Sequence, residues 1–318
     1  MRRILVIFLI SLSIAACGRR APKQQAVTQD SKTQTAEAAP VYVMPEPPSY
    51  LSSREEQAEW VAAHYWDRFD FDDPAWLSYP DATHNVFHSY MRVLFEMLPS
   101  GKAGEYLIIP LQKAQDYPAM YDRLLELYDY YLYHPNSPYK NEDLYVPVLE
   151  SVLANPKYDE LMKLSLREKL SMIMKNRVGD KAPDFNYITV EGEKGTLYGM
   201  NADYTLLFFH DLGCSYCMAL VEDVAGHIAS NITVQNLYQS GKLKVIAIEP
   251  DAAGKEMEEY GKFLPQGWLD AYEPAGEISG KKLYDMRSFP SMYLLDKDKK
   301  VLIKDFDNPA LIIERITQ

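Results

Sequence analysis

Apolar residues recur at helical spacing through the first half of the chain. Before Pro99, apolar residues recur every three or four positions, at Val86, Phe87, Tyr90, Leu94, Met97 and Leu98. The same spacing predicts further helices over residues 54–69, 120–134, 145–154 and 161–177. No strand-like alternation of comparable length occurs in this half of the sequence. We therefore predict an all-α domain of five or six helices over residues 49–177.

Polar residues mark the predicted starts of two of these helices. A Ser or Thr followed three residues later by Glu is the spacing of a capping box, in which each residue satisfies a backbone N–H of the other. Ser52-Ser53 and Glu55-Glu56 offer this spacing twice before the first helix. Ser165 and Glu168 repeat it and predict the start of the last helix at that point.

The apolar pattern changes after residue 177. Residues 204–209 and 243–248 are dense apolar runs, which are typical of strands buried on both faces of a sheet. Shorter strands are predicted over 185–190 and 196–198, and a hairpin over 291–295 and 301–304. Helices are predicted around 218–228, over 255–263 and after Pro309. We predict an α/β domain over residues 178–318, with a central mixed sheet flanked by helices.

The N-terminus has the pattern of an export signal. Two arginines precede an apolar run over residues 4–12, which is too short to span a bilayer as a helix. Ile14-Ala15-Ala16-Cys17 follows, and an aliphatic residue, two small residues and Cys form the pattern of a bacterial lipobox. We predict a signal peptide over 1–16 and lipidation of Cys17. The alternative is ordinary secretion with an incidental Cys.

Residues 17–48 are predicted to be a lipidated Cys followed by a flexible linker. They are rich in Gln, Thr, Ala and Pro and show no apolar periodicity, although the prolines at 45, 47 and 48 stiffen the end. No later stretch is long and apolar enough to span a membrane. Gly18 follows Cys17 where an Asp would signal retention in the inner membrane. We therefore expect a lipid anchor in the cell envelope, on the periplasmic face of the outer membrane.

Composition and charge narrow the class of protein. Apolar residues make up 47% and charged residues 25% of the chain, as is usual for folded soluble proteins, which excludes a wholly disordered chain. The formal charge of −12 argues against nucleic acid as a partner. Three cysteines are too few for a disulfide scaffold. If Cys17 carries lipid, Cys214 and Cys217 are left as an even pair.

That pair forms the motif Cys214-Ser215-Tyr216-Cys217 between a predicted strand and a predicted helix. A helix N-terminus favours a thiolate, which is the form of Cys that attacks a disulfide. Cys214 is the candidate nucleophile, and Cys217 would resolve the mixed disulfide. Zinc would need two further ligands, and the chain has no second Cys pair. A purely structural disulfide would close a very short loop and restrict little chain entropy.

Other candidates lie in the helical half. His84 and His88 share a helix face and could ligate a metal, but no carboxylate or Cys completes the set nearby, so a partly buried pair is favoured and we expect no metal. The helical half also has a cluster of four tyrosines, Tyr128, Tyr130, Tyr131 and Tyr133. We expect about half of them to pack inward. The polar loop over 134–142 ends a helix and could be functional.

Several stretches resemble a known group of proteins. GDKAPDF at 179–185, the segment from Phe208-Phe209 to Cys217, and FPSMYLLD at 289–296 are similar to the thioredoxin-like lipoproteins of Bacteroidetes. These belong to the TlpA/ResA-like thiol–disulfide oxidoreductases within the AhpC/TSA–redoxin superfamily. NSPYKNE at 136–142 and YVPVLE at 145–150 resemble the helical domain of unknown function DUF5106, which precedes such modules.

The resemblance implies a thioredoxin-like fold for residues 178–318. It implies that Pro290 lies on the loop facing the Cys pair, that its peptide bond is cis, and that it exposes the Phe289 backbone to an incoming peptide. Tyr216 and Phe289 would line this substrate groove. The implied partners are client proteins with disulfides and a membrane thiol that donates electrons. No cofactor is implied beyond the redox-active Cys214–Cys217 pair.

The sequence also departs from the family pattern. Gly213 stands where thioredoxins usually carry Trp, and Phe208 stands where they carry a buried acid. His210 and Asp211 are nearer to the motif and could assist proton transfer. These departures leave the direction of electron transfer open.

From these observations we predict a membrane-anchored periplasmic thiol–disulfide oxidoreductase that reduces client disulfides. The alternative is a non-catalytic envelope lipoprotein whose helical domain recognises a partner. The helical domain is too large to be a linker, which keeps this alternative open.

Overall fold

The computed structural model describes residues 38–211, 213–250 and 264–318. The predicted signal peptide, Cys17 and most of the predicted linker lie outside these residues, as does the helix expected over 255–263. No helix of the described residues is long and apolar enough to cross a membrane. Residues 40–318 belong to one compact unit.

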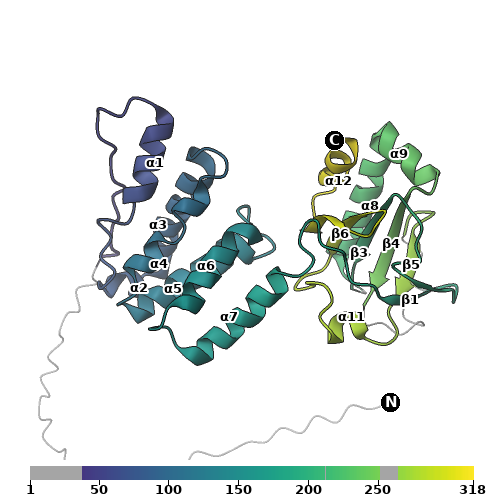
Figure 1. The fold of residues 1–318 in the computed structure, drawn as a ribbon. Coiled ribbons are helices and arrows are strands. Elements are labelled where there is room, and N and C mark those ends of the chain that lie inside the picture. The colour runs from purple at the N-terminus through teal and green to yellow at the C-terminus, as the bar shows by residue number, and fades with distance from the viewer. Residues whose placement is uncertain (1–37, 212, 251–263) are drawn as a thin grey trace, which may run out of the picture. The chain divides into compact units, whose positions relative to one another are not determined.

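The first half is helical, as predicted (Figure 1). Its α-helices are α1 (Arg54–His64), α2 (Ala75–Ser78), α3 (Pro80–Arg92), α4 (Ile109–Lys113), α5 (Pro118–Tyr128), α6 (Glu142–Ala154) and α7 (Glu160–Ile173). Two π-helical segments continue α3 and α5, namely η1 (Val93–Met97) and η3 (Asp129–Tyr133), and η2 (Ala103–Glu105) is a short 3₁₀ turn. The sequence did not predict α2 and α4, because a helix of one turn is too short to show a period.

Of the two predicted capping boxes, the one at α1 is confirmed and the one at α7 is wrong. At α1 the Ser53 hydroxyl accepts the Glu56 N–H at 3.1 Å, and the Glu56 carboxylate accepts the Ser53 N–H at 3.3 Å, so this capping box is confirmed. The capping box predicted at Ser165 is wrong, although the helix predicted over 161–177 starts within one residue of the observed α7. The cap of α7 is Asp159, whose carboxylate accepts the N–H groups of Leu161 and Met162. Asp at this position caps a helix as well as Ser does, so the helix begins earlier than its Ser165-Glu168 spacing indicated.

Aromatic residues dominate the core of the helical half. Tyr128 and Tyr131 are buried while Tyr130 is exposed, so the tyrosines divide between core and surface as predicted. Tyr42 also packs on this core, with its ring 5.1 Å from that of Tyr65, and donates a hydrogen bond to the Tyr65 carbonyl. The packed part of the chain therefore begins near Tyr42, before the boundary predicted at residue 49.

The second half contains a mixed sheet, whose described strands have the order β2-β1-β5-β4-β3-β6-β7. The strands are β1 (Asn186–Thr189), β2 (Lys194–Thr196), β3 (Tyr204–Phe209), β4 (Leu243–Glu249), β5 (Leu269–Tyr272), β6 (Ser291–Asp296) and β7 (Val301–Phe306). β3, β4 and β5 run parallel, and β6 is antiparallel to β3. The strand β5 was not predicted, because it is short and contains an acid.

Helices cover both faces of this sheet, which confirms the predicted architecture. Figure 1 shows α8 (Ser215–Ser230), α9 (Ile232–Gln239), α11 (Glu277–Gly280) and α12 (Ala310–Thr317) around the strands. Leu206 and Phe208 of β3 pack with α8 and α12, whereas Leu207 and Phe209 pack with α11 on the opposite face. Successive residues of β3 therefore point to opposite faces and all but Tyr204 are buried, as the dense apolar run indicated.

Candidate active site

Cys214 and Cys217 lie where the chain leaves β3 and enters α8. Cys214 is the N-cap of α8, and its Sγ accepts the Cys217 N–H at 3.1 Å. A disulfide joins the two residues, whose Cα atoms are 5.2 Å apart. Gly213, just before the pair, has φ of +80°, a conformation that favours glycine over residues with a side chain. A Trp at this position would be strained in this backbone.

The two cysteines differ in accessibility. The Cys217 side chain is fully buried (0% exposed) and packs against Leu220 and Val221 of its own helix. Cys214 is only half-buried, at the helix end. A partner molecule can therefore reach Cys214 but not Cys217. This difference suits the predicted roles, with Cys214 as the nucleophile and Cys217 as the residue that resolves the mixed disulfide.

Pro290 lies at the same edge of the sheet as the Cys pair. Ser291 opens β6 and pairs with Phe209, the last residue of β3. Pro290 therefore precedes β6 at the edge where the chain leaves β3 toward Cys214. The Phe289–Pro290 peptide bond is cis, as predicted.

A groove of about 820 Å³ opens beside this edge. Tyr216, Phe289 and Pro290 line it, so the structure brings together three of the predicted site residues. Residues of the helical half line it as well: Asp129, Tyr133, His134, Pro135 and Asn136. The sequence indicated that the 134–142 loop ends a helix and could be functional, but nothing local shows that this loop lines a groove together with Tyr216 of the Cys motif.

His210 and Asp211, the predicted candidates for proton transfer, lie in different environments. Asp211 is exposed. His210 is fully buried at the end of β3, and its Nδ1 lies 3.9 Å from the Glu249 carboxylate. Burial lowers the pKa of His210 from 6.5 to about 3, so the imidazole is neutral at physiological pH. A role in proton transfer stays a prediction for both residues.

The low pKa of His210 predicts a loss of stability in mild acid. Below pH 6.5 the unfolded chain binds a proton at His210 that the folded protein does not bind until about pH 3. From pH 7 to pH 5, wild-type protein should lose about 2 kcal/mol of unfolding free energy more than His210→Gln does. Urea denaturation at both pH values measures this difference. Equal losses in wild type and His210→Gln would contradict the prediction.

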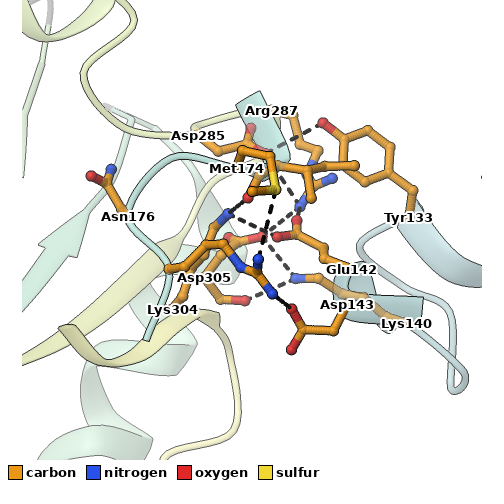
Figure 2. Close-up of polar contacts among 12 residues, drawn as sticks. Tyr133, Lys140, Glu142, Asp143, Met174, Asn176, Asp285, Arg287, Lys304 and Asp305 are labelled. Carbon is orange, nitrogen blue, oxygen red and sulfur yellow. Dashed lines mark hydrogen bonds and ion pairs between the residues drawn. The ribbon is translucent and has the colours of Figure 1, made fainter. Parts of the chain in front are cut away.

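A polar cluster joins the Pro290 loop to the helical half (Figure 2). Arg287, three residues before Pro290, forms ion pairs with Glu142 of α6, with Asp305 at 2.8 Å and with Asp285 at 3.4 Å. Its guanidinium also lies over the Tyr133 ring, 3.5 Å from the centroid. Burial lowers the pKa of Arg287, but the three carboxylates raise it by more, so the guanidinium stays charged.

Asp305 binds residues on both sides of Pro290. Its carboxylate accepts hydrogen bonds from Lys140, Arg287 and Ser291, each at 2.8 Å. Burial alone would raise the pKa of Asp305, but the charges and hydrogen bonds of Lys140 and Arg287 outweigh it and hold this pKa below its usual value. Arg287 precedes Pro290 and Ser291 follows it, so Asp305 fixes both ends of the loop. Sequence reasoning missed this cluster, because its members are far apart along the chain.

His84 and His88, weighed as metal ligands, both pack against the ring of Tyr131. Their rings stack with centroids 6.5 Å apart, and His84 Nε2 lies 3.1 Å from the Tyr131 hydroxyl. Among the described residues, no group of three or more His, Cys, Asp or Glu is arranged to hold a metal ion.

The sheet order, the cis proline and the Cys pair together define a thioredoxin-like protein. The family described as "Domain of unknown function (DUF5106)" matches residues 16–176, about half of the chain, and the chain belongs to this family. The resemblance to DUF5106 and the resemblance to thioredoxin-like proteins are thus confirmed. A comparison with curated proteins gave no match.

Several solved structures are similar to this chain. A thioredoxin-like protein from Bacteroides caccae ATCC 43185 is 32% identical, with a TM-score of 0.77 over 88% of this chain and 99% of that one. The C-terminal domain of an uncharacterized protein from Bacteroides fragilis NCTC 9343 is 35% identical, with a TM-score of 0.41 over 45% of this chain and 99% of that one. The thioredoxin domain of a thiol-disulfide oxidoreductase from Bacteroides vulgatus is 17% identical, with a TM-score of 0.38 over 44% and 98%.

Proposed function

We propose that this protein is a thiol–disulfide oxidoreductase that reduces disulfides in client proteins. The observation that carries the proposal is the Cys pair at the start of α8, with a partly exposed Cys214 and a fully buried Cys217 beside the Pro290 loop. A pair built only for stability would not need an accessible sulfur next to an open groove. Tyr216 of the Cys motif lines the groove, so a client segment bound there would lie near the Cys pair.

The reaction consists of two exchange steps. The Cys214 thiolate attacks one sulfur of the client disulfide, so a bond forms between Cys214 and the client and the other client sulfur leaves as a thiolate. The Cys217 thiolate then attacks Cys214 Sγ, which forms the Cys214–Cys217 disulfide and releases the second client thiolate. The client gains two electrons and the protein loses two, which produces the oxidised pair described above. A membrane dithiol would reduce this pair for the next cycle.

The start of α8 supports the first step. The Cys217 N–H points at Cys214 Sγ and donates a hydrogen bond to it. The free N–H groups of the first helical turn and the helix dipole add positive potential at the same place, and together these effects stabilise a thiolate. No acidic residue lies in the first turn of α8, where it would oppose this effect.

The proposed location of the protein is the cell envelope. It rests on the lipobox at Ile14-Ala15-Ala16-Cys17 and on the linker-like composition that follows. A diacylglyceryl group on Cys17 would hold the packed unit at the periplasmic face of the outer membrane. Incorporation of labelled palmitate tests the anchor, because a Cys17→Ser variant that still carried label would exclude this site.

Reduction of insulin tests the proposed activity. With dithiothreitol as donor, the wild-type protein should accelerate insulin precipitation, and Cys214→Ser and Cys217→Ser should both fall to the uncatalysed rate. A wild-type rate no greater than that of both variants would contradict the proposal. The reduction potential of the Cys214–Cys217 couple then decides the direction of transfer, because a reductase needs a potential well below that of an oxidase.

A further inference from the structure

The groove beside the Cys pair has two walls from distant parts of the sequence. Tyr216, Phe289 and Pro290 form one wall, and the 133–136 segment forms the other. Hydrogen bonds within the chain hold that segment in place. The Asn136 N–H donates to His134 Nδ1 at 3.2 Å, and the Asn141 N–H donates to the Leu132 carbonyl at 2.9 Å. The helical half therefore presents an ordered surface to whatever enters the groove.

The polar cluster of Figure 2 connects these two walls. Arg287 lines the groove and forms an ion pair with Glu142, just beyond the 133–136 segment. Its contact with the Tyr133 ring adds a second link between the walls. The groove volume of about 820 Å³ is within the range of sites for drug-sized ligands, so it suits a short extended segment and excludes a folded domain.

The charges along the groove are mostly balanced, with one exception. Asp129 pairs with Lys169, and Arg287 is surrounded by carboxylates. Asp307 is exposed and lines the groove together with Tyr216, where burial and the nearby negative charge of Asp307 raise the pKa of the Tyr216 hydroxyl. Within the described ranges, no ion pair includes Asp307. The groove therefore carries an unbalanced negative charge next to the middle of the Cys motif.

Tyr216 adds a second feature that favours cations. Its side chain is 53% exposed and lies between Cys214 and Cys217 in sequence. The face of an exposed aromatic ring attracts Lys and Arg side chains, and a neighbouring carboxylate strengthens that attraction. Tyr216 and Asp307 thus form an aromatic and acidic pair at the point where a residue flanking the client Cys would pass.

We propose that this groove selects extended client segments that carry a basic residue beside the disulfide cysteine, with the helical half forming the second wall of the site. The inference rests on the proposed function and adds the substrate class. It also gives the DUF5106 region a role, because the client would touch the 133–136 segment while its disulfide meets Cys214.

The charge preference is tested with two disulfide-bonded peptides. They are identical except that one carries Lys and the other Glu next to the cysteines. The wild-type protein should reduce the Lys peptide with a kcat/KM about fivefold higher than that for the Glu peptide, because opposite charges attract across the groove. Asp307→Lys should reverse the preference. Asp298→Lys makes the same charge change in the β6–β7 turn, outside the groove, and should keep the wild-type ratio. A ratio near one in wild type, or equal ratios in both variants, would overturn the proposal.

A second variant tests the helical wall. Asn136→Trp adds bulk to the 133–136 segment and should raise KM for the Lys peptide several-fold, whereas an unchanged KM would show that the client does not touch this wall. Reduction of glutathione disulfide distinguishes a failure of the selectivity inference from a failure of the proposed function. If wild-type protein reduces it but does not distinguish the peptides, only the selectivity inference fails. If it reduces neither peptide nor glutathione disulfide, the proposed function fails as well.

Discussion

Cys217→Ser should convert the protein into a trap that holds clients as mixed disulfides through Cys214. The accessible Cys214 still attacks the client, but the hydroxyl that replaces the Cys217 thiol cannot displace it, so the first product of the exchange accumulates. Reduced full-length variant, mixed with a disulfide-bonded client and analysed on a non-reducing gel, should show about tenfold more adduct than wild type. Adding dithiothreitol should release the client.

Two further variants are the controls for this experiment. Cys214→Ser should form no adduct, because the remaining thiol at Cys217 is fully buried. Adduct through Cys217 instead would reverse the assigned roles. If a variant lacking both thiols retained the same partners without a covalent bond, the helical half would be a binding module and the non-catalytic alternative would be favoured.

Arg287→Met should lower the free energy of unfolding by about 3 kcal/mol. Arg287 is mostly buried, with 16% of its side chain exposed, and its removal leaves Glu142, Asp285 and Asp305 without their shared cation. Removing one partner of a buried ion pair costs about 3–5 kcal/mol, and the low end applies because Lys140 and Lys304 still pair with two of the carboxylates. Urea denaturation at pH 7 measures the change.

Arg167→Met is the control for this prediction. Arg167 forms an ion pair with Glu160 on the surface of α7, where the two side chains are 49% and 69% exposed. Exposed pairs contribute little, so this variant should lose less than about 1 kcal/mol. If Arg287→Met lost no more than Arg167→Met, the cluster would not stabilise the contact between the Pro290 loop and the helical half.

Much of the fold was predictable from local patterns. β3 was predicted over the residues where it is observed, because a strand buried on both faces needs an unbroken apolar run. The capping box at Ser53 was predictable, since both of its partners lie within one helical turn. The capping residue of α7 was not, because Asp159 and Ser165 are both acceptable caps and only the packing of the helix selects between them.

The site shows the same division between local and long-range information. The spacing of Cys214 and Cys217 predicts their place at the start of α8, and the structure agrees. The position of Pro290 beside them follows from the resemblance and from the pairing of β6 with β3. The second wall of the groove carries no sequence signal, because about 80 residues separate the 133–136 segment from the Cys motif.

By itself, the sequence determined the helical and α/β halves, the central strands, and the Cys motif with its two candidate roles. These features depend on neighbours within a few residues, and periodicity or spacing records such neighbours directly. Only the tertiary structure decided that Tyr42 packs on the helical core, that Asp305 holds both ends of the Pro290 loop, and that the helical half lines the groove. These depend on which distant segments meet when the chain folds, and the one-dimensional order of residues does not specify such contacts.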